Sequence, residues 1–196
     1  MRTEYDVIVV GARIAGTALA CELAKRGRTV LLLDRATFPS DTLSTHNLFG
    51  NSLAMLREMG VLERLLETGT PLYNRAYMNF EGVVIDGRFP GTEEESSCLC
   101  VKRLYFDAVL HDHACKQPGI DAIEGFRVTG VTKDAGTVTG VVGRSRDGEF
   151  RQYAAKLVVG ADGRLSSIRE LVGSQRKVAV PTDFASYVAY VEGYRQ

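Results

Sequence analysis

Two glycines near the amino terminus have the spacing of a phosphate-binding turn. Gly11 follows an apolar, β-branched run at residues 5–10, and Gly16 lies early in a segment of helical periodicity, 14–25. A helix that begins directly after a strand presents free N–H groups and the positive end of its dipole to an anion. Gly11 lets the chain turn sharply out of the strand, and Gly16 lets the helix pack closely on the sheet. The residues expected to hold a pyrophosphate are Gly11, Arg13, Ile14, Ala15 and Gly16.

One position departs from the usual G-x-G-x-x-G pattern. Arg13 replaces the middle glycine, which normally lacks a side chain so that the backbone can approach the phosphates. We expect the Arg13 side chain either to point away from the ligand or to contact a phosphate itself.

An acidic residue stands where a ribose would be bound. Asp34 ends a second apolar strand, 29–33, roughly twenty residues after Gly11, the spacing at which a carboxylate meets ribose hydroxyls. Strand, glycine turn, helix, strand and carboxylate together indicate a βαβ dinucleotide-binding unit with parallel strands. The alternative is a doubly wound domain that binds another ligand, in which Asp34 only caps or solvates a strand end.

Two later motifs indicate which dinucleotide is bound. Residues 160–169 fit the pattern D-G-x-x-S-x-x-R directly after a buried strand, and residues 103–107 fit R-x-x-F-D at the start of a helix. With the glycine turn, these motifs resemble the superfamily of FAD-dependent oxidoreductases. That superfamily contains p-hydroxybenzoate hydroxylase-like aromatic monooxygenases, geranylgeranyl reductases and flavin-dependent halogenases. The resemblance extends over essentially the whole chain, with the motifs in the same order.

The resemblance implies roles for residues on the adenosine side of FAD. Gly11 and Gly16 would line the pyrophosphate. Asp34 would bind the adenosine ribose, where the superfamily more often has Glu, and Arg35 would reach the adenine or a phosphate.

The resemblance also implies roles for the later motifs. Arg103 would stand beside the ribityl and pyrophosphate part of FAD, a role that suits its guanidinium fork. Asp162 and Gly163 would lie near the pyrophosphate, in a motif also implicated in NAD(P)H use. The alternative for Asp162 is a helix cap, and Ser166 and Arg169 are expected to brace the turn.

No side chain is assigned as the catalytic acid or base, because in this superfamily the flavin supplies the chemistry. The weak candidate is His46, in the polar loop 39–46, since an unperturbed imidazole titrates near neutrality. A surface or hydrogen-bonded histidine is the alternative.

No metal site is predicted. His111 and His113 point in different directions on a helix, and His111 with Cys115 makes only two ligands. We expect Cys98 and Cys100 to be buried thiols on one face of a strand.

The composition excludes several classes of function. The chain has 24 lysines and arginines against 24 aspartates and glutamates, so it lacks the basic excess of a nucleic-acid or anionic-membrane binder. No apolar run approaches the roughly 18 residues of a membrane span, and four cysteines are too few for a disulfide scaffold. We expect a soluble protein in the reducing cytoplasm, with its oligomeric state left open.

The expected fold class is α/β: a Rossmann-like FAD-binding domain with a central parallel sheet and a β-meander, plus part of a β-rich substrate module. Residues 1–74 and 101–177 would form the FAD-binding domain, and 75–100 and 178–196 would belong to the substrate module. A strand pattern at 187–191 has no evident partner, so we expect the carboxy-terminal remainder of that module to be missing and the chain to be truncated.

Shorter patterns predict the remaining elements. Helices are expected within 53–66 (broken near Gly60), 106–114 and 167–172, and strands at 126–133, 137–144 and 150–159. Asp147-Gly148 predicts a two-residue hairpin between the last two of these strands, and Asp107 is expected to complement a helix dipole from the first turn.

By resemblance, the function would be NAD(P)H-dependent monooxygenation. Reduced flavin would react with O₂ to form a hydroperoxide that hydroxylates a small aromatic or hydrophobic substrate. Two alternatives stay open: a geranylgeranyl-reductase-like enzyme that reduces isoprenoid double bonds, which the R-x-x-F-D motif favours, and a non-catalytic dinucleotide-binding fragment.

Overall fold

The computed structural model describes residues 2, 4–42, 44, 47–92, 96–185 and 187. The chain divides into two compact units, each described by itself. The first comprises Met1–Ser40 and Leu110–Ala185, and the second comprises Asp41–Val109 and Ser186–Gln196.

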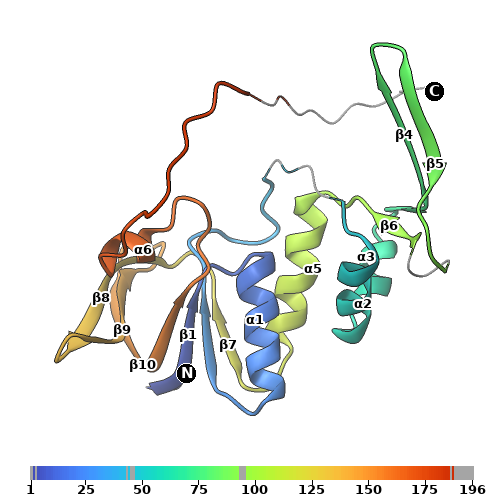
Figure 1. Ribbon diagram of the computed structural model, residues 1–196. Coiled ribbons are helices and arrows are strands. Elements are labelled where there is room, and N and C mark those ends of the chain that lie inside the picture. Colours follow the sequence, from blue (N-terminus) through green and yellow to red (C-terminus); the bar gives the residue numbers. More distant parts are fainter. Residues whose placement is uncertain are drawn as a thin grey trace. The chain divides into compact units, whose positions relative to one another are not determined.

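The first unit is built on a six-stranded sheet in the order β7-β2-β1-β10-β9-β8 (Figure 1). Its strands are β1 Glu4–Val10, β2 Val30–Leu33, β7 Ile120–Ile123, β8 Arg127–Asp134, β9 Thr137–Arg144 and β10 Phe150–Gly160. β7, β2, β1 and β10 pair in parallel, whereas β10, β9 and β8 form an antiparallel meander. The predicted α/β class, with a parallel sheet and a meander, is confirmed.

The βαβ unit forms as its sequence pattern predicts. Helix α1, Ile14–Lys25, connects β1 to β2 and packs on the sheet at β1, β2 and β7. β2 is an apolar run whose four side chains are all buried, as a strand covered on both faces requires. Ile8 and Leu31 are fully buried, and Phe126 and Tyr153 extend the core to the meander with ring centroids 5.5 Å apart.

The second unit contains helices and small antiparallel pairs. Its elements are α2 Gly50–Glu58, α3 Leu62–Leu66, β3 Leu72–Tyr73, β4 Arg75–Phe80, β5 Val83–Arg88 and β6 Cys98–Leu99. The predicted helix break near Gly60 is confirmed by the boundary between α2 and α3. β3 pairs with β6, and β4 pairs with β5 in a hairpin held by an ion pair between Arg75 and Asp86. Helix α5, Arg103–Cys115, continues from this unit into the first.

Several expectations need correction. Strand β7 was not predicted. It has only four residues, and they show too short an alternation of apolar and polar side chains to indicate a strand. The β9–β10 ladder ends at Arg144 and Phe150, so the hairpin loop has five residues rather than two. Cys98 is buried as predicted, but Cys100 is exposed.

Two further expectations are not decided by the structure. The predicted strand 187–191 falls largely outside the described residues, and Tyr187 has no assigned secondary structure. The assignment of 75–100 and 178–196 to a substrate module stays a prediction. Within the described part of the chain, no helix has the length and apolar character needed to cross a bilayer.

We predict that Leu32→Ala lowers the free energy of unfolding by about 2–5 kcal/mol, because Leu32 is fully buried in β2 and truncation leaves a cavity. The matched control is Leu157→Ala on β10, where Leu157 is 54% exposed. That control should change stability by less than about 0.5 kcal/mol. Denaturant unfolding measures both, and equal losses would contradict the assigned core.

Candidate functional site

The glycine turn is a point of close backbone contact. Gly11 has φ +106°, and a Cβ added to it would lie 2.4 Å from the carbonyl oxygen of Ala161. A Cβ added to Gly16 would lie 1.7 Å from the carbonyl oxygen of Gly11 and 3.2 Å from the Cβ of Ala161. Any side chain at position 11 or 16 would therefore separate α1 from the ends of β1 and β10.

The amino terminus of α1 is suited to bind an anion. Arg13 is its N-cap residue with extended backbone, and the Arg13 side chain makes no cap hydrogen bond to the first turn. The Thr17 hydroxyl donates to the carbonyl oxygen of Ala12 at 2.7 Å and thereby fixes the first turn. The N–H groups of the first turn and the helix dipole thus face the glycine turn, as a pyrophosphate site requires.

The Arg13 side chain contacts residues of the segment after β2, and whether it also reaches a phosphate stays a prediction. Its Nη2 donates to the Ser40 hydroxyl at 2.9 Å, and its guanidinium carbon lies 5.7 Å from the ring centroid of Phe38. Phe38 in turn stacks on His111 at 4.4 Å between centroids. The side chain that replaces the middle glycine is therefore held against residues 38–40.

Asp34 is buried and its carboxylate braces the turn. One oxygen accepts a hydrogen bond from the backbone N–H of Ala12 at 2.7 Å, and the other accepts from the N–H of Ala36 at 2.8 Å. Each carboxylate oxygen has a second lone pair, so these bonds are compatible with a further ribose hydroxyl. Ribose binding by Asp34 stays a prediction.

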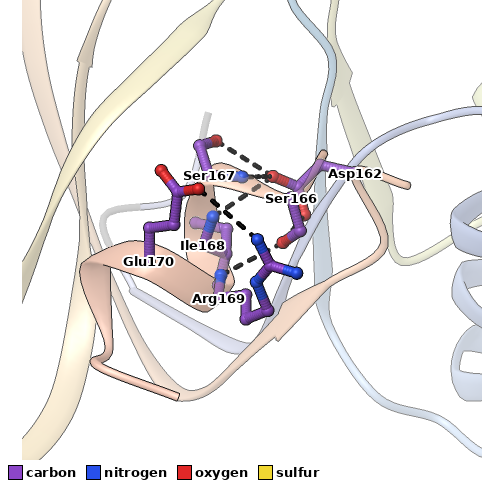
Figure 2. Close-up of polar contacts among 6 residues, drawn as sticks. All are labelled: Asp162, Ser166, Ser167, Ile168, Arg169 and Glu170. Atoms are coloured by element: carbon purple, nitrogen blue, oxygen red, sulfur yellow. Dashed lines mark hydrogen bonds and ion pairs between the residues drawn. The ribbon is translucent and has the colours of Figure 1, made fainter. Parts of the chain in front are cut away.

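The D-G-x-x-S-x-x-R motif forms a hydrogen-bonded cap for α6, Ser167–Leu171 (Figure 2). Asp162 accepts from the Ser166 hydroxyl through one oxygen, and from the N–H groups of Ser167 and Ile168 through the other, at 2.7 and 3.2 Å. The Ser166 hydroxyl oxygen accepts from the N–H of Arg169 at 3.1 Å, so Ser166 braces the turn as expected. The Arg169 guanidinium pairs with Glu170 at 3.4 Å.

Hydrogen bonding favours the ionised form of Asp162. Partial burial raises the pKa of its carboxyl group, but the hydrogen bonds from Ser166, Ile168 and Ser167 outweigh burial and lower the pKa below its usual value. The carboxylate is therefore ionised at neutral pH and lies next to Ala161, which contacts the glycine turn. Gly163 follows with φ +86° and open space at its Cα.

The R-x-x-F-D motif forms an ion pair within α5. Nε and Nη2 of Arg103 donate to the two oxygens of Asp107 at 2.7 and 2.8 Å, and Asp107 is fully buried. The expectation that Asp107 complements the helix dipole from the first turn was wrong, because α5 begins at Arg103 and its first turn contains no acidic residue. The Asp107 carboxylate pairs with Arg103 instead. A flavin contact of Arg103 stays a prediction.

His111 is buried next to an acidic residue. Its Nδ1 lies 3.2 Å from a Glu124 carboxylate oxygen and 3.7 Å from the Cys115 sulfur. Burial lowers the pKa of His111, although the carboxylates of Glu124, Asp34 and Asp112 act in the opposite direction. Among the described residues, no three His, Cys, Asp or Glu side chains are grouped to hold a metal ion. His46, the weak catalytic candidate, lies outside the described residues.

The chain belongs to the FAD binding domain family, whose match extends over residues 4–191. This assignment confirms the predicted resemblance to FAD-dependent oxidoreductases. The glycine turn fits FAD, because Gly11 and Gly16 allow the amino terminus of α1 to lie against Ala161, and the N-cap residue Arg13 makes no side-chain cap hydrogen bond there.

Similar proteins are named for different activities. Rifampicin monooxygenase of Streptomyces venezuelae is 32% identical over 169 residues, which cover 86% of this chain and 34% of the relative. A probable electron transfer flavoprotein-quinone oxidoreductase of Escherichia coli is 35% identical over 175 residues, which cover 88% of this chain and 39% of the relative. The solved structure of anhydrotetracycline hydroxylase from Streptomyces rimosus matches with a TM-score of 0.73 at 26% identity, covering 87% of this chain and 34% of that one. The chain thus spans well under half the length of each of these proteins.

We predict that Gly16→Ala weakens FAD binding at least tenfold and destabilises the fold by about 1–3 kcal/mol, because the added Cβ collides with the Gly11 carbonyl. FAD fluorescence quenching and denaturant unfolding measure the two effects. Gly87→Ala is the control, since Gly87 has open space around it. Unchanged FAD affinity in Gly16→Ala would contradict the assigned turn.

We predict that Asp162→Asn lowers stability by about 1 kcal/mol at pH 7, because it weakens the cap of α6. A carboxyl group whose folded pKa is lowered stabilises the fold above its unfolded pKa of about 3.9, and this stabilisation is lost as pH falls through the folded value. The difference between wild type and variant should therefore shrink below about pH 4. Asp147→Asn, in an exposed loop, is the control, and a difference independent of pH would refute the ionised cap.

Proposed function

We propose that this chain is the FAD-binding part of an NAD(P)H-dependent monooxygenase that hydroxylates a small aromatic or hydrophobic substrate. The observation that carries the proposal is the contact between the Gly11–Gly16 turn and Ala161, next to Asp162, in a chain of the FAD binding domain family. Two of the relatives are named as a monooxygenase and a hydroxylase, which supports oxygen-dependent chemistry.

The residues of the first unit would hold and orient the cofactor. The N–H groups at the start of α1 would donate to the pyrophosphate, and Asp34 would accept from the adenosine ribose while bracing the turn. When bound, FAD would supply the redox chemistry and the reaction with O₂. The protein's own contribution is to fix the cofactor and to set the electrostatics around it.

The second unit offers a surface for an aromatic substrate. A cleft of about 780 Å³ is lined by Phe49, Tyr73, Tyr77 and Phe89, among other residues. The rings of Phe49 and Phe89 meet edge to face at 5.8 Å, and Tyr73 lies 6.4 Å from Phe89. Such a cluster suits an aromatic or apolar molecule, because aromatic rings pair favourably in this geometry.

The alternative is a reductase of isoprenoid double bonds, which the R-x-x-F-D motif at Arg103 favours. The two functions differ in their use of oxygen. Substrate-stimulated consumption of O₂ and NAD(P)H by the FAD-loaded protein would support the monooxygenase, whereas anaerobic reduction of an isoprenoid alkene would support the reductase.

We predict that the purified chain binds FAD and is stabilised by it, and that Asp34→Ala weakens binding at least tenfold. The variant loses the carboxylate that accepts from Ala12 and that we assign to the ribose. Asp34→Asn, which keeps the size of the side chain, should lie between wild type and Asp34→Ala.

The control for this prediction is Arg169→Ala. The Arg169 guanidinium pairs with Glu170 at the protein surface, so its removal should alter the FAD dissociation constant less than about twofold. Calorimetric titration with FAD measures all four proteins. Equal dissociation constants for Asp34→Ala and Arg169→Ala would contradict the assigned roles. Absence of any FAD binding or thermal stabilisation would refute both enzymatic functions.

A further inference from the structure

A chain of side-chain contacts connects His111 on α5 to the glycine turn. The His111 imidazole stacks on the Phe38 ring, with centroids 4.4 Å apart and planes inclined by 21°. The Arg13 guanidinium carbon lies 5.7 Å from the centroid of the same ring, and Nη2 of Arg13 donates to the Ser40 hydroxyl at 2.9 Å. All four residues belong to the first unit. One aromatic ring therefore contacts both the side chain that replaces the middle glycine and a histidine from another helix.

The surroundings of His111 fix the orientation of its ring. The residue is only 6% exposed. Nδ1 lies 3.2 Å from a carboxylate oxygen of Glu124, which directly follows β7, and 3.7 Å from the sulfur of Cys115. A carboxylate oxygen only accepts, so we assign the neutral tautomer with its hydrogen on Nδ1. These contacts lie at the edge of the imidazole and leave a face of the ring for Phe38.

The charge state of His111 is compatible with the nearby cation. Burial lowers the pKa of His111, so the imidazole is neutral at pH 7. Three carboxylates act in the opposite direction, those of Glu124, Asp34 and Asp112. A neutral imidazole stacks on Phe38 without repelling the Arg13 guanidinium, which makes the cation–π contact with the same ring.

Arg13 needs such support because of its place in the turn. It is the N-cap residue of α1 and lies between Gly11 and Gly16, where the N–H groups assigned to the pyrophosphate begin. A long side chain at this position has many rotamers, and some of them would occupy the space next to the turn. Fixing one rotamer costs conformational entropy, and a contact that fixes it before the ligand arrives improves binding.

We propose that His111 is a positioning residue of the cofactor site: by stacking on Phe38, it holds the Arg13 side chain in the orientation in which the glycine turn accepts FAD. His111 acts through Phe38 and Arg13 and makes no contact with the cofactor itself. The inference rests on FAD binding, which is part of the proposed function, and adds to it a contribution from helix α5.

Two variants of similar volume separate the aromatic stack from simple packing. His111→Leu fills the space without a ring and should weaken FAD binding about fivefold, the size expected for one lost aromatic pair. His111→Phe supplies a ring again and should restore the wild-type FAD dissociation constant to within about twofold. The Glu124 side chain is 32% exposed, so water can replace its contact with His111 in both variants. Calorimetric titration of the purified chain with FAD measures all three proteins.

A double-variant cycle tests whether His111 acts through Arg13. Arg13→Gln removes the guanidinium that His111 is proposed to position. In that background, His111→Leu should therefore change the FAD dissociation constant by less than about twofold, because coupled residues are not additive. A full fivefold loss in both backgrounds would show that His111 supports FAD binding by another route.

The matched control is His113→Leu. His113 lies two positions along the same helix, faces a different direction and has Nε2 3.0 Å from the amide nitrogen of Gln117. This variant should keep the wild-type FAD dissociation constant to within about twofold. Denaturant unfolding of each variant verifies that the titrated protein is folded.

A second measurement requires no cofactor. In the NMR spectrum of the ¹⁵N-labelled chain without FAD, His111→Leu should shift the Nε–Hε resonance of Arg13, because the Phe38 ring next to it loses its support. His111→Phe should shift this resonance less, and His113→Leu should leave it in place.

Three results would overturn the inference while FAD binding by the wild type stands. They are an affinity of His111→Phe as low as that of His111→Leu, additive losses in the cycle, and an Arg13 resonance that His111→Leu leaves unmoved. Absence of FAD binding by the wild-type chain would instead refute the proposed function, and the inference with it. The two failures are therefore distinguishable.

Discussion

The close backbone contact among Gly11, Gly16 and Ala161 is the constraint on which the site depends. β1 and β10 are parallel neighbours with Val10 opposite Gly160, and the N–H of Ala161 donates to the carbonyl oxygen of Val10 at 2.7 Å. Because Gly11 and Gly16 have no Cβ that would collide with this backbone, the amino terminus of α1 lies against the ends of β1 and β10. Two motifs far apart in the sequence thereby meet at one corner, the place to which we assign the pyrophosphate.

The two sides of this corner are fixed by different interactions. On one side, Asp34 accepts hydrogen bonds from the backbone of Ala12 and Ala36, which sets the path of the chain out of β2. On the other side, Arg13 extends to Ser40 and Phe38. The side chain that replaces the middle glycine is thereby held by residues 38–40.

The sequence predicted those parts of the molecule that local patterns determine. The bounds of α1, the break at Gly60 and the capping role of Ser166 follow from periodicity, glycine position and hydroxyl chemistry within a few residues. The stacking of Phe38 on His111 and the register of Arg127 opposite Arg144 had no local signal, because each depends on how distant strands align. β7 was missed for the same reason, since four residues gain strand character only by pairing with β2.

The central claim is that the Gly11–Gly16 turn and the adjoining Ala161–Gly163 segment receive the pyrophosphate of FAD. Amide chemical-shift mapping by NMR of the ¹⁵N-labelled chain during FAD titration tests it most directly. The account predicts that the largest shifts fall on the N–H groups of residues 11–16 and 161–163. Saturable binding of FAD that leaves these amides unmoved and shifts others instead would contradict the account.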